Sequence, residues 1–169
     1  MIPGTCLEYS EMAQSTYVMA KRRLYSEIKS RDYGITFYWP RIFYAFSAIH
    51  QRPRILREAL NARKKGSFFE LKYPNEQHDY IEMMDVGLQL KSVLDVAITG
   101  TWDIGTGVLH SNRELVEQLG FFNVSVPSNS QEVVDPRVAD SWNFPAREKI
   151  PNHECQIENT VRYFSRISM

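Results

Sequence analysis

The sequence predicts an α/β fold with a parallel sheet, and three observations support that prediction. Short apolar segments of strand length alternate along the chain with longer segments of helical period. The run from Ile35 to Phe46 is almost continuously apolar and aromatic, which is typical of a parallel strand covered on both faces. Gly34 and Gly66 follow two of the helical segments, where glycine commonly ends a helix. With 169 residues, the chain is expected to form one domain.

The first elements are a strand and a helix. Residues 2–9 are expected to be the end of a buried strand that runs into a loop. Residues from about 12 to 31 have a helical period, because one predicted face carries Ala13, Tyr17, Ala20, Leu24 and Ile28. The opposite face carries Lys21, Arg22, Arg23, Glu27 and Lys29, and is expected to face solvent apart from Lys21.

The later elements continue the alternation. Pro40 cannot donate a ladder hydrogen bond, so the strand from Ile35 to Phe46 is expected to bend or end near it. The remaining expected elements are helix 54–65, strand 67–72, helix 84–95, strand 100–104 and helix 111–119, then an irregular segment from Pro127 to Pro151 and a last helix at about 154–166. Asp85 is expected to cap the helix over 84–95.

Composition excludes several classes of protein. The chain is 43% hydrophobic and 24% charged, as in ordinary soluble globular proteins, and its formal net charge is +0. No overall field attracts nucleic acid or an anionic membrane, and no apolar run approaches the roughly 20 residues of a membrane-spanning helix. The start of the chain lacks a signal-peptide pattern. Cys6 and Cys155 form no disulfide framework or metal-binding spacing, so a reducing cytoplasm is the expected location.

Tyr17 and Lys21 form a Tyr-x-x-x-Lys pair in the first predicted helix. Side chains four residues apart lie on the same side of a helix, where an ammonium group can stabilise a phenolate. The pair can therefore act as a general acid and base. A tyrosine and a lysine that merely share a helix surface are the alternative.

Further motifs follow that pair in a recognisable order. They are Arg41–Phe46, Gln51–Pro53, His78–Val86 and Trp102–Gly107. The ordered set resembles the C-terminal half of the extended short-chain dehydrogenase/reductase family, which contains sugar-nucleotide epimerases, dehydratases and reductases. The resemblance covers residues from about 2 to 120.

The resemblance implies a partial Rossmann-like parallel sheet over residues 1–46 and a substrate-binding half over 47–169, within a single domain. None of the eight glycines forms the Gly-rich turn that binds the dinucleotide in this family, so the N-terminal dinucleotide-binding βαβ units are expected to be missing. Gly105-Thr106-Gly107 is interpreted as a strand-to-helix turn. A sheet edge left exposed in this way predicts a homodimer or a heteromeric partner.

The resemblance also assigns catalytic roles. Thr5 would hydrogen-bond the reacting oxygen of the substrate, although a threonine that satisfies its own strand end is the alternative. Tyr17 would exchange a proton with a sugar hydroxyl, and Lys21 would lower the pKa of Tyr17 and hydrogen-bond the ribose of NAD or NADP. Tyr17 and Lys21 are therefore both catalytic and cofactor-binding candidates. Only 12 residues separate Thr5 from Tyr17, which is fewer than the family usually has.

The substrate, by resemblance, is a nucleotide-sugar, and its candidate contacts are Tyr44, Arg52, Arg54 and His78. Tyr44 stands where the family has asparagine, and His78 stands where it has the arginine that holds the diphosphate. Histidine is only partly charged near neutral pH and cannot make a bidentate guanidinium contact, so diphosphate affinity is expected to fall. Arg52 and Arg54 can supply cationic contacts, or they can be solvated arginines at a helix start.

Two hypotheses about function remain. The first is an NAD(P)-dependent nucleotide-sugar epimerase, dehydratase or reductase in which Tyr17 is the acid and base, completed by a partner or a missing segment. The second is a truncated, non-catalytic relative that binds a nucleotide-sugar or a protein. The short spacing from Thr5 to Tyr17 and the substitutions at Tyr44 and His78 favour the second hypothesis.

Overall fold

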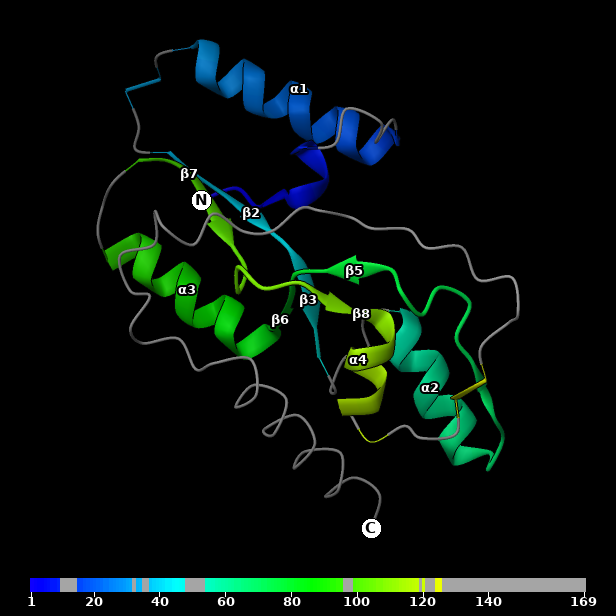
Figure 1. Cartoon of the computed structure of the whole chain (residues 1–169). Helices are drawn as coiled ribbons and strands as arrows, with labels where there is room; N and C mark the ends of the chain where they lie inside the picture. Colours follow the sequence, from blue (N-terminus) through cyan, green and yellow to red (C-terminus); the bar gives the residue numbers. More distant parts are fainter. Residues whose placement is uncertain are drawn as a thin grey trace.

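A computed structural model describes residues 1–9, 15–31, 33–34, 37–47, 54–95, 99–118, 120 and 124–125. Strands and helices alternate along this part of the chain, which confirms the predicted α/β class (Figure 1). The strands are β1 (Gly4–Thr5), β2 (Tyr38–Ile42), β3 (Tyr44–Phe46), β4 (Phe69–Glu70), β5 (Gln77–His78), β6 (Tyr80–Glu82), β7 (Gly100–Ile104), β8 (His110–Ser111) and β9 (Val124–Ser125). The helices are the 3-10 helix η1 (Cys6–Tyr9), α1 (Thr16–Ser30), α2 (Arg54–Lys64), α3 (Met83–Asp95) and α4 (Asn112–Gln118). The predicted segments 127–151 and 154–166 lie outside the described residues.

A three-stranded parallel sheet, in the order β1-β2-β7, lies between α1 and α3. Successive side chains of a strand point to opposite faces. Trp39 packs against Tyr25 of α1 at 5.2 Å between ring centroids, whereas Tyr38 and Ile42 pack with the α3 residues Val86 and Val93. The two helices therefore cover opposite faces of the sheet (Figure 1).

Pro40 lies inside β2, in register with Trp102 of β7, and β2 ends two residues later at Ile42, so the strand ends near this proline as expected. The carbonyl oxygen of Tyr38 accepts a hydrogen bond from the backbone nitrogen of Ile2, which precedes β1, at 3.0 Å. Residues two apart in a strand bond to the same neighbour. The nitrogen of Pro40 thus faces the β1 side, and the ladder between β2 and β7 loses no hydrogen bond.

The predicted single strand from Ile35 to Phe46 is instead two strands, β2 and β3, with Phe43 between them. The nitrogen of Phe43 still donates to Ile104 of β7 at 3.0 Å, but that of Tyr44 donates to Asp79 at 3.1 Å. From Tyr44 onward the chain pairs in parallel with β6. The strand therefore changes partner at Phe43, because β6 supplies the next set of acceptors.

The packed face of α1 differs from the predicted one. Ser15 caps the helix, and its side chain accepts a hydrogen bond from the nitrogen of Val18 at 3.3 Å. Val18 is fully buried, whereas Tyr17 and Leu24 are exposed. The helix also ends at Ser30 with an extended C-cap residue, so Gly34 does not end it as expected. The sequence pattern misplaced this face because α1 rests on the sheet through Val18 and the ring of Tyr25, together with the polar side chains of Lys21 and Arg22.

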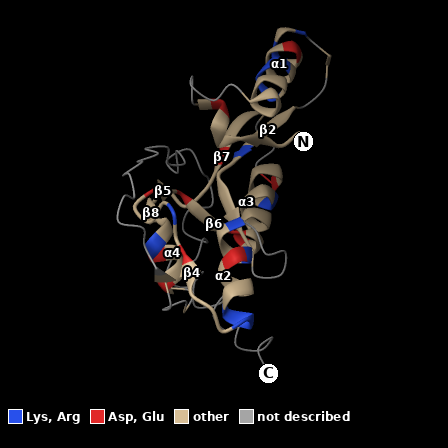
Figure 2. Ribbon diagram, turned by 90° about the vertical axis from the view of Figure 1, so that its right-hand side faces the viewer, with Lys and Arg blue, Asp and Glu red and all other residues tan. Residues whose placement is uncertain are grey.

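The remaining helices and β7 agree with the predictions to within one or two residues, although β4 is shorter than the strand expected over 67–72. Phe46, Leu56, Phe69, Tyr80, Leu115 and Val116 form a core between α2, α4 and strands β3, β4 and β6. Burial of each such side chain contributes about 2 kcal/mol. Both Lys/Arg and Asp/Glu occur on α1, α2 and α4 (Figure 2). The division of the chain at residue 46 stays a prediction.

The start of α3 corrects one further expectation. Glu82, and not Asp85, caps this helix, since its carboxylate accepts a hydrogen bond from the nitrogen of Met84 at 2.6 Å. Asp85 is the third residue of the helix, within its first turn, and is buried. Burial, with a smaller contribution from the charge of Glu82, raises the pKa of Asp85 to about 6.

Candidate functional site

Tyr17 and Lys21 lie together on α1, as their spacing predicted. The ammonium nitrogen of Lys21 lies 5.7 Å from the centroid of the Tyr17 ring and 5.9 Å from that of the Trp39 ring. The same nitrogen donates a hydrogen bond to the carbonyl oxygen of Pro3 at 2.6 Å. Lys21 is therefore anchored next to β1, while the phenol of Tyr17 remains more than half exposed, at 55%.

Thr5 ends β1, the strand next to which Lys21 is anchored. It is buried, its backbone nitrogen donates to Glu8 at 2.8 Å, and its hydroxyl accepts from the nitrogen of Leu7 at 3.4 Å. No hydrogen bond joins Thr5 and Tyr17, both of which are described residues. The hydroxyl of Thr5 thus has a local structural role, while the hydroxyl of Tyr17 is open to solvent.

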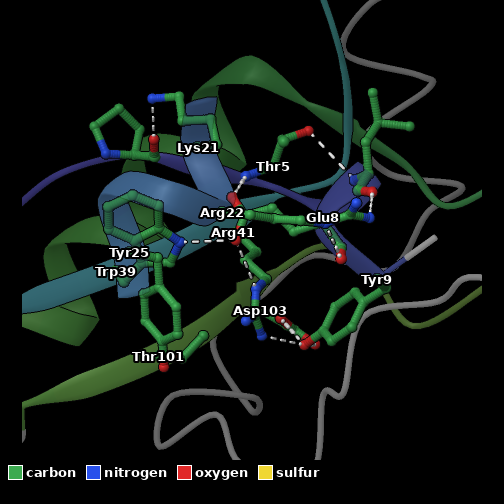
Figure 3. A network of polar contacts seen from close by, with 12 residues as sticks. Thr5, Glu8, Tyr9, Lys21, Arg22, Tyr25, Trp39, Arg41, Thr101 and Asp103 are labelled. Atoms are coloured by element: carbon green, nitrogen blue, oxygen red, sulfur yellow. Dashed lines mark hydrogen bonds and ion pairs between the residues drawn. The ribbon is translucent and has the colours of Figure 1, made fainter. Parts of the chain in front are cut away.

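A polar cluster that sequence reasoning missed lies beside Thr5 (Figure 3). We define the polar cluster as Glu8, Tyr9, Trp39, Arg41 and Asp103. The side chain of Glu8 is 3% exposed, and its carboxylate accepts hydrogen bonds from the Trp39 indole at 3.0 Å and from the Arg41 guanidinium at 3.2 Å. Glu8 is therefore a buried carboxylate with charged and neutral donors, the arrangement that stabilises such a group.

The second half of the polar cluster is centred on the hydroxyl of Tyr9. This hydroxyl donates to the Asp103 carboxylate at 2.7 Å and accepts from Arg41 at 2.8 Å. Burial, followed by the hydrogen bond to and the charge of Asp103, raises the pKa of Tyr9 to about 12, so it stays protonated near neutral pH. Polar residues at every second position, Trp39 and Arg41 in β2 and Thr101 and Asp103 in β7, were the sequence signal for this face.

Asp79 organises the segment after β7. Its carboxylate is fully buried and accepts hydrogen bonds from the nitrogen of Thr106 at 2.8 Å, from its hydroxyl at 2.6 Å, and from the nitrogen of Gly107 at 2.9 Å. Gly107 has a φ of 77°, a conformation that favours glycine. Residues 105–107 therefore form a bend held by Asp79, in agreement with the interpretation of this segment as a turn.

A cavity of about 790 Å³ lies between α2, the segment around β4, and the start of α4. Its volume is within the range usual for small-molecule sites. The rings that line it belong to Tyr44, Phe68, Phe69, Tyr73, His78 and Tyr80. Its charged lining residues are Arg54, Lys65, Lys72, Glu58, Glu70 and Glu76.

Three of the four predicted substrate contacts line this cavity, namely Tyr44, Arg54 and His78. Tyr44 and His78 stack with 3.8 Å between ring centroids and 28° between planes. The imidazole of His78 also lies 3.4 Å from the carboxylate of Glu76, and Arg54 forms an ion pair with Glu58. Arg52 lies outside the described residues. The cavity thus brings together residues 44, 54 and 78, and Lys21 does not line it.

The cavity floor is fixed by Tyr80 and Asn112. The Tyr80 hydroxyl donates to the side-chain oxygen of Asn112, whose side-chain nitrogen donates to the carbonyl of Tyr73 at 2.8 Å. Burial raises the pKa of the Tyr80 phenol far above its ordinary value. These two residues therefore hold the floor and present no ionisable acid at neutral pH.

The described residues contain neither a candidate metal-binding cluster nor a candidate membrane-spanning helix. No group of three or more His, Cys, Asp or Glu side chains gathers there in a way that could hold a metal ion. None of the described helices is long and apolar enough to cross a membrane.

Solved structures share the architecture of this chain. No protein-family model and no curated protein sequence matches it. An NAD-dependent NDP-hexosamine 5,6-dehydratase, TunA, involved in tunicamycin biosynthesis, superimposes with a TM-score of 0.74 and 14% identity, over 97% of this chain and 62% of its own. The chain shares its fold.

Two more structures agree. A dTDP-glucose 4,6-dehydratase from Bacillus anthracis, in complex with NAD, gives a TM-score of 0.72 at 18% identity over 97% of this chain and 60% of its own. A UDP-glucose 4-epimerase from Thermus thermophilus, also with NAD, gives 0.68 at 17% identity over 97% and 63%. The chain therefore spans about 60% of the length of these enzymes and has the Rossmann-like fold of that part.

Proposed function

We propose that this chain is the substrate-binding part of an NAD(P)-dependent nucleotide-sugar epimerase, dehydratase or reductase, with Tyr17 as the acid and base. The observation that carries the proposal is the position of Lys21, whose ammonium lies over the Tyr17 ring and is anchored to Pro3 two residues before Thr5. The contact is a cation–π interaction, which keeps the ammonium group close to the exposed Tyr17 ring. The solved structures with this fold are an NAD-dependent dehydratase and two enzymes in complex with NAD, and they support the same reaction class.

Lys21 is the described residue that would hold a ribose of the dinucleotide. Lys21 has three N–H donors, and the hydrogen bond to Pro3 uses one, so the others can bind the hydroxyls of a ribose. No Gly-rich turn opens a described helix, so the pyrophosphate does not fit the residues at hand. When bound, NAD(P) would supply the hydride acceptor, and the pyrophosphate must be held by residues outside those described or by another chain.

The chain's own residues would then handle the proton. The Tyr17 phenolate would accept a proton from a sugar hydroxyl and return it at the end of the cycle. Lys21 would stabilise the phenolate, and Thr5, if its hydroxyl turned from Leu7, would donate to the reacting oxygen. Pairing at the outer edge of β1, which no described strand covers, would bring a homodimer or a heteromeric partner to this side of the sheet.

The second candidate function is a non-catalytic nucleotide-sugar- or protein-binding module. The local bond of the Thr5 hydroxyl favours it, because this hydroxyl already has a structural partner. Histidine in place of the diphosphate-binding arginine favours it as well.

NADH binding tests the first candidate. Trp39 lies next to Lys21, so energy transfer from tryptophan to nicotinamide reports a cofactor at this place. We expect saturable transfer that Tyr17→Phe and Lys21→Ala weaken about tenfold or more, with Tyr33→Phe, at a tyrosine that is 50% exposed, as the matched control. Nucleotide-sugar turnover followed by NMR would then separate enzyme from module. Absence of transfer up to millimolar NADH contradicts a cofactor site in this chain alone.

A further inference from the structure

Glu8 joins segments that lie far apart in the sequence (Figure 3). One of its carboxylate oxygens accepts a hydrogen bond from the backbone nitrogen of Thr5 at 2.8 Å. The other oxygen accepts from the Trp39 indole at 3.0 Å and from the Arg41 guanidinium at 3.2 Å. An ionised carboxylate has acceptor sites only, so it can serve all three donors at once. A single buried carboxylate therefore ties the end of β1 to β2.

Trp39 carries this tie to Lys21. The Trp39 side chain is fully buried, and its indole packs so closely on β1 that a Cβ atom at Gly4 would lie 2.4 Å from the indole nitrogen. The ammonium nitrogen of Lys21 lies 5.9 Å from the centroid of the same ring, within the range of a cation–π contact. Because the bond to Glu8 fixes the indole N–H, it also fixes the ring surface that Lys21 contacts.

The backbone of Glu8 makes a further connection to α1. The guanidinium of Arg22, the residue next to Lys21, donates to the carbonyl oxygen of Glu8 at 3.2 Å and to that of Leu7 at 3.4 Å. Arg22 thus holds η1 against the part of α1 that carries Lys21. The side chain and the backbone of one residue therefore connect the two elements that bear Thr5 and Lys21.

We propose that Glu8 is a positioning residue, which fixes Thr5 directly and Lys21 through Trp39, so that the two groups keep one relative arrangement. The inference rests on the proposed function only in that Thr5 and Lys21 are taken as groups of the reaction site. The carboxylate is occupied by three donors and transfers no proton itself. Removal of this carboxylate should therefore release the Thr5 amide and the Lys21 ammonium together.

Two NMR signals of the full chain test this inference. The shift of the Thr5 amide hydrogen reports its charge-assisted hydrogen bond, and the ring-current displacement of the Lys21 ε-methylene signals reports the position of Lys21 over Trp39. Glu8→Leu keeps a side chain of similar size and removes both acceptor oxygens. We expect the Thr5 amide signal to move upfield by about 0.5 ppm or more, and the Lys21 displacement to fall by about half or more.

Two further variants serve as controls. Val116→Ala shortens a fully buried side chain of the core between α2 and α4, so it should lower stability and leave both signals in place. Glu8→Gln keeps one oxygen, which is best used by the two donors Trp39 and Arg41. Its Thr5 amide signal should therefore move while its Lys21 signals stay, and this variant decides the matter if Glu8→Leu does not fold.

Several results overturn the inference. A folded Glu8→Leu chain with both signals at their parent positions does so, as does a Val116→Ala chain in which both move equally. If only one signal moves in Glu8→Leu, or the Thr5 amide stays in Glu8→Gln, the joint role is wrong. The NADH test is independent, because these signals are measured without cofactor. A parent chain that does not bind NADH removes the proposed function, and the two signals still decide the role of Glu8.

Discussion

The side chains of the polar cluster are paired by hydrogen bonds, and Glu8 at its centre is buried, whereas two aromatic side chains at the cavity are largely exposed. In the cluster, Glu8 meets Arg41 and Trp39 inside the fold, and Asp103 accepts from Tyr9. At the cavity, Phe68 and Tyr73 leave large parts of their rings exposed. A buried carboxylate needs its partners for the fold to persist, whereas an exposed ring costs little stability when removed.

This difference separates stability from recognition. Changes in the polar cluster should lower the free energy of unfolding, and they should affect Thr5 through its hydrogen bond to Glu8. Changes at the rim of the cavity should alter ligand binding and leave the free energy of unfolding almost unchanged. Tyr17 combines the two situations, since its phenol is exposed like the rings of the cavity but lies over a lysine anchored next to β1.

The largest effect is expected for Glu8→Ala. The substitution leaves the Arg41 guanidinium and the Trp39 indole without their shared acceptor, and loss of one partner of a buried ion pair costs about 3 to 5 kcal/mol. Urea denaturation should show that decrease in the free energy of unfolding. Glu27→Ala, which removes an exposed ion pair with Arg31, is the control and should cost less than about 1 kcal/mol. Equal decreases in the free energy of unfolding for the two variants would contradict the larger contribution of the buried cluster.

The next effect is expected for Gly4→Ala. A Cβ atom at residue 4 would lie 2.4 Å from the indole nitrogen of Trp39 and 2.8 Å from a carboxylate oxygen of Glu8. Because both groups are fixed by their hydrogen bonds, overpacking should cost about 1 to 3 kcal/mol. Gly87→Ala, where nothing lies within 4 Å, is the control and should be neutral or slightly stabilising, since alanine favours a helix. A Gly4→Ala variant as stable as the parent chain would show that Trp39 and Glu8 can move to accommodate the added Cβ atom.

The periodic spacing of apolar residues in the sequence predicted the fold class and most helices, because these depend on local patterns. It placed α2, α3 and β7 to within one or two residues. It failed where a hydrogen-bonding partner distant in sequence decides the structure. The exchange of β7 for β6 as the partner strand at Phe43 is such a case.

The candidate site was predictable in part for the same reason. Spacing alone brings Tyr17 and Lys21 together, and the resemblance to a family placed Tyr44, Arg54 and His78, which line one cavity. The partners of Glu8 could not be predicted, because the register of β1 and β2 brings Arg41 to the end of β1 that Glu8 follows. The register of β2 and β7 then places Asp103 beside Arg41, where it accepts from Tyr9. The exposed aromatic residues Phe68 and Tyr73 could not be predicted either, because they lie in irregular segments on either side of β4 whose sequence has no helix or strand period.

Asp85 is a second buried carboxylate, and burial raises its pKa from 3.8 to about 6. In the unfolded chain Asp85 ionises near pH 4, so between pH 4 and 6 the native state binds more protons. Stability should therefore fall as pH rises through this window. The difference between Asp85→Asn and the parent chain should grow in favour of the variant by about 1 to 2 kcal/mol from pH 4 to 7, allowing for solvent screening. Chemical denaturation across that range measures it, and a constant difference would contradict the prediction.

The smallest effect on stability is expected for Arg54→Ala, and this variant tests whether Arg54 binds a diphosphate in the cavity. Arg54 is exposed and forms an ion pair with Glu58 one turn away on α2, so its removal should cost no more than about 0.5 kcal/mol. If this arginine held a diphosphate, the variant would weaken a nucleoside diphosphate much more than the nucleoside. We expect both to weaken equally, by less than about threefold, because Glu58 already neutralises the guanidinium. The double substitution Arg54→Ala, Glu58→Ala keeps the net charge at zero and should bind like the parent chain. A selective loss of diphosphate binding in Arg54→Ala would instead make the cavity a cationic site, and would give the first candidate function its substrate contact.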